Sequence, residues 1–550
     1  MDPDRFAEEK ARGLTIDLGF AWTTLTSGRQ LALVDVPGHV RFLKNMLAGL
    51  GGIDAALFVV AAPEGWKPQS EEHLRILDLL GVRRGLVALT KVGLVDEETV
   101  ELARLELADA VGGTFLEDAP VVAVDVPTDR GLNDLRSALD ALTASVPATP
   151  DNGRPRLWVD RVFAAKGSGT VVTGTLTHGA LSEGDELSVT PRARRVRVRT
   201  LQSLGRTMNE VGPGARVAVN LTGIAHDEIR RGDGLVKPGH WHLSRSFDAS
   251  LRVLASLDHD VSRRGAYQAY IGSGEYPVRL RVLGAEALSP GSTGSVRIHL
   301  STVLPMVPGD RFILRESGRD ETVGGGEVLD VEPILAAAKA RPTNSPERLV
   351  AERGWVSAEH LSRLTGTEVA GNLGSWVVDP VVLASAKADL RSAIAEAGPL
   401  GLDAAALDDR QRAVLSTLEA VVVDGARIRP VGTTDSLVGH RFVTALDAAM
   451  FSPPEPDGVD RAELRELVRR GLVVERDGYF FSPAAIEEAA RRFAAALTAS
   501  PTGLTVAQVR DALGTTRKHA LPLLAHLDAT GVSRRRGDLR FGGPRLPEAS

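Results

Sequence analysis

Residues 14–147 alternate short apolar runs with stretches of helical spacing, and this alternation constrains the fold of the chain most. Three of the apolar runs indicate strands: Leu31–Val36, Ala55–Ala62 and Leu86–Leu89. Gln69–Leu80, between the second and the third run, places leucines at helical spacing. Strands that alternate with helices predict a parallel sheet in an α/β domain. Ligands of such domains bind at the carboxyl ends of the strands, so functional residues are expected there.

The pattern changes twice after this region. Val146–Pro155 contains Pro, Asn and Gly and indicates a linker. From residue 157 to about 333, short β-branched runs separated by glycine turns predict β-barrels, and the length is enough for two. Beyond Ala336, helical patterns alternate with short apolar pieces, which is typical of winged helices; at about 50–60 residues each, about four modules fit. We expect domains at 1–147, 154–242, 243–335 and 336–550, with the last module at about 500–545.

The composition excludes several classes of protein. The formal net charge is -6, so any site for a polyanion must be local. The absence of cysteine excludes disulfides, thiolate metal sites and cysteine nucleophiles. Met1–Lys10 lacks the apolar core of a signal peptide, and no apolar run reaches the ~20 residues that a membrane span needs. We expect a cytoplasmic protein without a membrane partner.

Asp35–His39 follows a predicted strand directly and carries the clearest chemistry. A carboxylate at a strand end, here Asp35, can hold Mg²⁺, and Gly38 lets its backbone N–H approach a terminal phosphate. His39 can then orient a water for in-line attack on phosphorus. The alternative is a tight strand-to-helix turn with no ligand.

Arg12–Asp17 lies upstream, separated from that motif by one predicted strand. Thr15 could add its hydroxyl to Mg²⁺ and its N–H to the same phosphate. The alternative is a glycine turn that leads into a strand. The two segments in this order favour the phosphate site over chance.

These segments resemble a known family. Glu8–Ala21 is similar to switch I of translational GTPases, and Val34–His39 is similar to their switch II. More narrowly, the sequence TIDLGFA in the first segment resembles the bacterial selenocysteine-specific elongation factors. The same holds for Glu64–His73, Asp160–Phe163 and Lys166–Thr175.

The resemblance implies a fold and a function. The fold is a P-loop-type α/β GTPase domain, two β-barrels as in elongation factor Tu, and a C-terminal array of winged helices. The function is GTP-dependent delivery of selenocysteinyl-tRNA to the ribosome at recoded UGA codons, by a monomer that uses GTP and Mg²⁺. By motif position, Thr15 and Asp35 are the Mg²⁺ ligands, Gly38 senses the γ-phosphate, and His39 is the catalytic residue that positions water. Thr90 and Lys91 stand in the guanine-binding motif.

The first barrel is expected to hold the aminoacyl end of the tRNA. Asp160, Arg161 and Arg216 match family positions around that pocket. Selenocysteine is largely a selenolate at neutral pH, so a cationic pocket can select it over a neutral seryl group. The alternative is a structural ion pair between Asp160 and Arg161, with Arg216 solvated.

The C-terminal segment is locally basic. From Thr515 to Arg545 it has seven basic residues against two acidic ones. Such a segment suits phosphate contacts in an mRNA hairpin, although charge runs are often only solvated surface. The expected mRNA-binding residues are Arg517 and Lys518, at the predicted start of a recognition helix, and Arg534, Arg535 and Arg536, before a predicted wing hairpin.

The chain departs from the family pattern in its nucleotide motifs. No G-x-x-x-x-G-K-[ST] motif occurs before Arg12, so we expect an incomplete GTPase domain, from a start assigned too late or a gene cut at its front. Gly93 replaces the aspartate that contacts guanine, and Asp96 is a poor substitute for it. Asp125 stands in the last nucleotide motif, where Ser-Ala is expected. We therefore predict GTP binding at least a hundredfold weaker than in a complete relative, over ~2.7 kcal/mol.

Two other hypotheses remain open. One is an RNA- and tRNA-binding relic of this factor that no longer turns over nucleotide. The other is a different GTPase of the elongation-factor-Tu type, with a C-terminal array that binds proteins.

Overall fold

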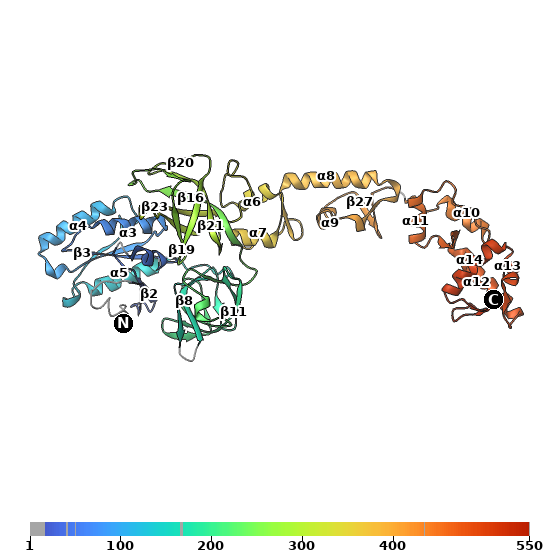
Figure 1. Ribbon diagram of the computed structural model, residues 1–550, viewed down its shortest axis with the longest axis horizontal. Coiled ribbons are helices and arrows are strands. Elements are labelled where there is room, and N and C mark those ends of the chain that lie inside the picture. Colours follow the sequence, from blue (N-terminus) through green and yellow to red (C-terminus); the bar gives the residue numbers. More distant parts are fainter. Residues whose placement is uncertain (1–16, 40–41, 50, 166–168, 434, 549–550) are drawn as a thin grey trace. The chain divides into compact units, whose positions relative to one another are not determined.

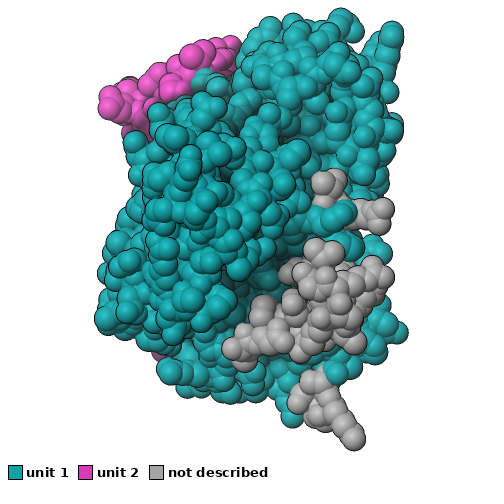
Figure 2. All heavy atoms as spheres, turned by 90° about the vertical axis from the view of Figure 1, so that its left-hand side faces the viewer, with its two compact units in different colours: residues 1–379 teal, residues 380–550 magenta. Residues whose placement is uncertain are grey.

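The computed structural model describes residues 17–39, 42–49, 51–165, 169–433 and 435–548 (Figure 1). The chain divides into two compact units, residues 1–379 and residues 380–550, which Figure 2 distinguishes by colour. Within the described ranges, no helix combines the length and the apolar character needed to cross a bilayer.

The first unit begins with an α/β domain. Its strands are β1 (Gly19–Thr24), β2 (Gln30–Asp35), β3 (Ala56–Ala61), β4 (Gly85–Thr90) and β5 (Val121–Val124). Its helices are α2 (Leu43–Gly49), α3 (Pro68–Leu79), α4 (Glu97–Val111) and α5 (Leu132–Ser145), with short 3-10 turns η2 (Val92–Leu94) and η3 (Val126–Thr128). Strands β3, β4 and β5 form a parallel sheet in that order, which confirms the predicted α/β class.

Helices cover both faces of this sheet (Figure 1). Leu77 of α3 and Leu107 of α4 lie in the apolar cluster of one face, and Leu139 of α5 lies in the cluster of the other. A proline in the first turn favours the start of α3. Asp96 caps α4 by accepting the backbone N–H of Thr99.

The hairpin of β1 and β2 forms a two-stranded sheet of its own. Among the described residues, β2 pairs with β1 and not with β3, so β3 is an edge strand. Val59 of β3 is 57% exposed. The sheet therefore exposes an apolar side chain at this edge.

Two β-barrels follow. The strands of the first are β6 (Arg156–Trp158), β7 (Arg161–Ala165), β8 (Gly169–Thr177), β9 (Leu181–Ser182), β10 (Glu186–Thr190), β11 (Arg194–Ser203), β12 (Arg206–Met208), β13 (Glu210–Val211), β14 (Arg216–Thr222) and β15 (Gly234–Val236). Pairing of β10 with β11 closes its main sheet. The strands of the second are β16 (Leu243–Val253), β17 (Val261–Ser262), β18 (Tyr267–Ile271), β19 (Gly274–Val282), β20 (Ala287–Leu288), β21 (Thr293–Pro305), β22 (Arg311–Glu316) and β23 (Glu321–Asp330). Six of these form a closed barrel in the order β16-β21-β19-β18-β22-β23.

The second barrel packs on the α/β domain. Tyr270 and Ile313 of the barrel belong to the apolar cluster that contains α3. Polar contacts add to this interface: the Arg315 guanidinium donates to Glu72 of α3 at 3.2 Å, and Lys44 of α2 donates to Glu275 at 2.9 Å. Burial and ion pairs together join the barrel to the helices beside the sheet.

A small module closes the first unit. It comprises α6 (Pro346–Arg353), β24 (Trp355–Ser357), α7 (Ala358–Thr365) and β25 (Trp376–Val378). Ser345 caps α6, and Ser357 caps α7. Leu349 and Leu361 join the apolar cluster of the second barrel, so this module shares a core with it.

The second unit alternates helices and short hairpins. Its helices are α8 (Pro380–Glu396), α9 (Asp409–Leu415), α10 (Arg441–Ala449), α11 (Arg461–Arg469), α12 (Pro483–Ala499), α13 (Val506–Leu513) and α14 (Arg517–Ala529). Its strands are β26 (Leu402–Asp403), β27 (Val421–Asp424), β28 (Arg427–Pro430), β29 (Val474–Arg476), β30 (Tyr479–Phe481), β31 (Leu504–Thr505), β32 (Ser533–Arg536) and β33 (Leu539–Gly542). In the last module, α12, α13 and α14 pack on one another and precede the β32–β33 hairpin, which is a winged-helix arrangement.

Candidate functional site

The residues expected to contact phosphate lie at the end of strand β2 and directly after it. Asp35 is its last residue, Gly38 and His39 follow, and Asp35 and His39 are exposed. Among the described residues, and apart from the chain neighbours of Gly38, the atom nearest to a Cβ built on Gly38 is Cε1 of His73, at 4.0 Å. Thr15 lies outside the described residues, and its role as a Mg²⁺ ligand stays a prediction.

Thr90 and Lys91 lie at the carboxyl end of β4. The Thr90 hydroxyl donates to the carbonyl oxygen of Val60 at 3.2 Å. Lys91 has a left-handed backbone, with φ of 58°, and its Nζ lies 3.1 Å from Oε1 of Glu64. Both residues are therefore at the edge of the sheet where α/β domains bind ligands.

Asp125 lies at the carboxyl end of the neighbouring strand, because β5 pairs with β4 with Val124 opposite Thr90. Its side chain is 4% exposed and accepts the Thr128 hydroxyl at 2.6 Å. A Cβ built on Gly93 would lie only 2.6 Å from Oδ2 of Asp125. The two departures from the family pattern thus meet: the carboxylate of Asp125 occupies the space beside Gly93. From the sequence, Gly93 and Asp125 were interpreted as two independent losses of guanine-binding residues. That both motifs change in the same chain was the available sign that the two positions lie in contact.

Asp96 is committed elsewhere. Its Oδ1 accepts the backbone N–H of Thr99 at 2.9 Å at the start of α4. These hydrogen bonds from Thr99 lower the pKa of Asp96. The carboxylate that lies beside Gly93 is that of Asp125, whereas Asp96 caps α4.

In the first barrel, Asp160 and Arg216 form a buried pair. One guanidinium nitrogen of Arg216 donates to Oδ1 of Asp160 at 3.1 Å, and a second donates to Oδ2. Thr173 donates its hydroxyl to Asp160 at 2.6 Å. The two charged side chains are 8% and 16% exposed. Arg216 is therefore not a solvated side chain, and the ion pair of Asp160 is with Arg216 rather than with its neighbour Arg161.

Arg161 reaches toward the β1 hairpin. It donates to the carbonyl oxygen of Leu18 and lies 3.8 Å from Asp17. The ring of Phe20, in β1, lies under both guanidiniums: its centroid is 4.5 Å from Cζ of Arg161 and 3.4 Å from Cζ of Arg216. Phe20, which sequence reasoning did not single out, therefore covers the guanidinium groups of both arginines.

The last winged helix places part of the basic segment around one pocket. Helix α14 begins at Arg517 after Thr516, as expected for a recognition helix. Arg517 and Arg535 line a pocket together with Arg510 and Arg540. Lys518 points toward Tyr479 instead, with Nζ 5.3 Å from its ring centroid.

The arginine run Arg534–Arg536 lies in strand β32 itself and not before the hairpin. Successive side chains of a strand point to opposite faces, so Arg535 faces the pocket while Arg534 and Arg536 face away. Arg540 is buried and donates to Asp528 at 3.2 Å, which makes it part of the module's core structure. The basic segment is therefore divided between two faces.

Comparisons with protein families and known proteins agree with this arrangement. Residues 2–148 match the elongation factor Tu GTP binding domain, and residues 169–236 match elongation factor Tu domain 2. Residues 248–334 match the β-barrel domain of the selenocysteine-specific elongation factor, and residues 496–541 match a winged helix of elongation factor SelB.

Individual relatives belong to the same group. The selenocysteine-specific elongation factor of Desulfomicrobium baculatum is 39% identical over 66% of this chain and 60% of its own length. That of Escherichia coli (strain K12) is 34% identical over 60% of this chain and 52% of its own length. Elongation factor Tu 2 of Streptomyces avermitilis is 34% identical, with 60% of this chain and 87% of that protein covered. This chain thus spans about half to three-fifths of the curated selenocysteine-specific factors.

A solved structure matches over nearly the whole chain. The crystal structure of a bacterial selenocysteine-specific elongation factor, EF-Sec, aligns with a TM-score of 0.72 at 25% identity, covering 98% of this chain and 95% of that one. An α/β domain followed by two closed barrels and winged helices defines the class of elongation-factor-Tu-like translation factors. The chain belongs to this family, and within it to the selenocysteine-specific SelB type.

Proposed function

We propose that this chain delivers selenocysteinyl-tRNA to the ribosome at recoded UGA codons, with GTP, and that its last winged helix binds an mRNA hairpin. The observation that carries the proposal is the buried Asp160–Arg216 pair, with Arg161 beside it, in the first barrel. Burial strengthens the electrostatic effect of these groups because water does not screen them. The charge of Arg216 is compensated by Asp160, so a selenolate gains mainly from the guanidinium of Arg161 beside the pair, whereas a neutral seryl hydroxyl gains little.

Access to this pocket depends on β1. Phe20 lies against both guanidiniums, and Leu18 accepts a hydrogen bond from Arg161. An aminoacyl ester that approaches the arginines must displace this ring. Because β1 leads through a hairpin to Asp35, nucleotide state and pocket access are coupled in this proposal.

The guanine side of the nucleotide site rests on Asp125. Guanine presents two N–H donors on one edge, and a carboxylate can accept both. Asp125 retains acceptor capacity beyond its bond from Thr128, and Gly93 leaves room for its carboxylate. Bound Mg²⁺ neutralises phosphate charge; Asp35 and Thr15 would hold it, Gly38 admits the terminal phosphate, and His39 orients the attacking water.

Binding of mRNA rests on the last module. Arg517 and Arg535 line one pocket, at the first turn of α14 and on the neighbouring strand. Two guanidiniums and a helix N-terminus suit a phosphate of a hairpin loop. Lys518, Arg534 and Arg536 are exposed and extend the positive surface outside the pocket.

The experiment compares one tRNA charged with selenocysteine or with serine. Arg161→Gln should reduce the preference for the selenocysteinyl form at least tenfold, as measured by protection of the ester from hydrolysis. Arg206→Gln removes an equal charge from an exposed position of the same barrel and serves as the control. Equal preference in wild type and Arg161→Gln would refute the proposed role of the pocket.

A second candidate is favoured by Gly93: an RNA- and tRNA-binding protein without nucleotide turnover. The two candidates differ in calorimetry with GTP. Measurable, guanine-specific binding supports the elongation factor, whereas absence of binding, with retained affinity for tRNA and hairpin, supports the second candidate.

A further inference from the structure

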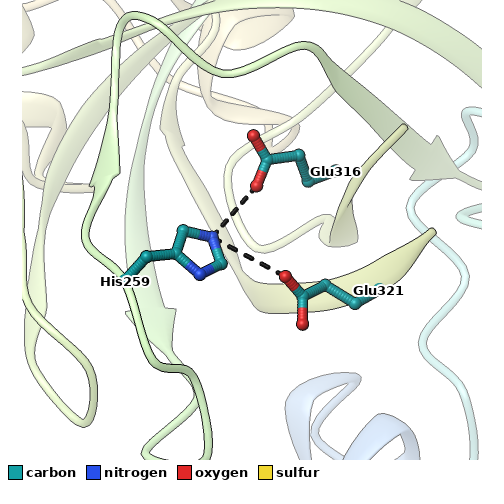
Figure 3. A group of neighbouring side chains, drawn as sticks. All are labelled: His259, Glu316 and Glu321. Carbon is teal, nitrogen blue, oxygen red and sulfur yellow. Dashed lines mark hydrogen bonds and ion pairs between the residues drawn. The ribbon is translucent and has the colours of Figure 1, made fainter. Parts of the chain in front are cut away.

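Three potential ligand side chains meet at one end of the second barrel (Figure 3). His259 lies in the loop between β16 and β17, Glu316 is the last residue of β22, and Glu321 is the first of β23. Nε2 of His259 lies 3.0 Å from Oε2 of Glu316 and 3.7 Å from Oε1 of Glu321. One nitrogen and two carboxylate oxygens thus converge on a single point.

The two carboxylates are an unfavourable pair without a cation. Glu316 and Glu321 are directly opposite in the register of the β22–β23 hairpin, where like charges destabilise. Oε1 of Glu321 is buried and accepts no hydrogen bond from the described residues. Arg319, in the hairpin turn, has its Nε 3.8 and 3.9 Å from the two carboxylates, too far for hydrogen bonds, and is 50% exposed. Arg319 therefore neutralises the pair only partly, and the other partner of these carboxylates is His259, whose Nε2 lies 3.0 Å from Oε2 of Glu316.

A fourth side chain orients the histidine. Nδ1 of His259 lies 3.0 Å from Oδ1 of Asp258. When Nδ1–H donates to that carboxylate, the lone pair of Nε2 faces the glutamates. A carboxylate behind a histidine is the usual support of a metal-ligating imidazole.

We propose that His259, Glu316 and Glu321 bind a divalent transition-metal ion of the Zn²⁺ class, with water completing the coordination. Zn²⁺ bonds to N and O of about 2.0–2.2 Å give a tetrahedron with edges of about 3.4 Å. The observed separations of 3.0 and 3.7 Å lie on either side of that edge, so small side-chain shifts suffice.

The site has a structural consequence for the unit. Arg315 and Thr322 form the next pair along the hairpin, and the guanidinium of Arg315 contacts Glu72 of α3 at 3.2 Å. A metal that joins His259 to both strands fixes the hairpin that makes this contact. The proposed site thus reinforces the interface between the second barrel and the α/β domain.

The test uses the untagged 550-residue chain, stripped with a chelator and titrated with Zn²⁺ by calorimetry. Wild type should bind one Zn²⁺ per chain at this site. His259→Gln, and Glu316→Gln with Glu321→Gln, should each weaken that binding at least tenfold. His226→Gln, at an exposed position of the first barrel, is the matched control and should bind as wild type does.

Two further measurements keep the outcome decisive. Far-UV circular dichroism establishes that each variant is folded, and Co²⁺ substituted for Zn²⁺ should give visible absorption in wild type that His259→Gln lacks. Arg319→Gln, which removes the competing guanidinium, should bind Zn²⁺ at least as tightly as wild type. Unchanged affinity in His259→Gln, or loss of binding in Arg319→Gln, would overturn the proposal and leave an ion-pair cluster of the protein alone.

Discussion

Exchange of side chains between positions 93 and 125 tests how this chain would recognise guanine. A Cβ at position 93 would lie 2.6 Å from Oδ2 and 2.7 Å from Cγ of Asp125, well inside the ~3.5–4.0 Å of a favourable contact. Asp125 has little room to move, because it is 4% exposed and accepts the Thr128 hydroxyl at 2.6 Å. Gly93→Ala should therefore force the carboxylate out of its place.

Two opposing effects set the change in the free energy of unfolding that Gly93→Ala causes. Overpacking a filled site costs about 1–3 kcal/mol. Gly93 does not have a positive φ, so the alanine also stiffens the unfolded chain, which stabilises by about 0.4–1 kcal/mol. We expect a net loss of about 1–2 kcal/mol in Gly93→Ala. Asp125→Ser shortens the opposing side chain, so the double variant should recover most of this loss, as a coupling in a double-mutant cycle.

Hydrogen exchange of the β4 and β5 amides is the suitable assay for stability, because a chain of several domains does not unfold in one transition. For binding, Asp125→Ser should lower affinity for GTP by about 1.5–3 kcal/mol, roughly 10–150-fold, without the same effect on ATP. Gly93→Asp with Asp125→Ser should restore the preference. Asp129→Asn, at an exposed neighbour, is the control. Unchanged exchange in Gly93→Ala, or unchanged GTP preference in Asp125→Ser, would refute this reasoning.

Three other predictions concern separate parts of the molecule. Burial and the nearby Arg156 lower the pKa of His178 to about 4, so between about pH 6.5 and 4 the unfolded chain binds a proton that the folded chain does not. The stability of the first barrel should therefore fall by about 3 kcal/mol as the pH drops through that range. Thermal melts of His178→Gln should show a flatter pH dependence. Arg535→Ala with Arg517→Ala should reduce the salt slope of hairpin binding by about two, whereas an unchanged slope would remove the pocket from the interface. The pair Lys91–Glu64 is about half exposed on both sides, so Glu64→Gln should change stability by less than about 1 kcal/mol in urea unfolding.

The sequence by itself determined four elements of the α/β domain. The predicted strands and the helix at Gln69–Leu80 lie within a single residue of β2, β3, β4 and α3. These elements are readable because hydrophobic periodicity is local: it depends on neighbours a few positions apart. The order of an α/β domain, two barrels and winged helices followed from the same kind of pattern, together with the family resemblance.

Which residues distant in sequence contact one another was decided by the tertiary structure alone. Asp160 is hydrogen-bonded to Arg216 rather than to its neighbour Arg161. The register of β14 against β8 pairs Arg216 with Thr175, so Arg216 lies diagonal to Thr173 and reaches both Thr173 and Asp160. The run Arg534–Arg536 is a strand whose side chains alternate between faces, so only Arg535 shares the pocket of Arg517.

The nucleotide motifs show most clearly what the sequence determines and what the tertiary structure decides. From the sequence, Gly93 and Asp125 are two separate departures, 32 positions apart by their numbers. Parallel pairing of β4 with β5 places them side by side, and the carboxylate of one fills the space that the other leaves. A sequence specifies which side chains are present and where the strands run. Strand register and packing decide which of these side chains come into contact.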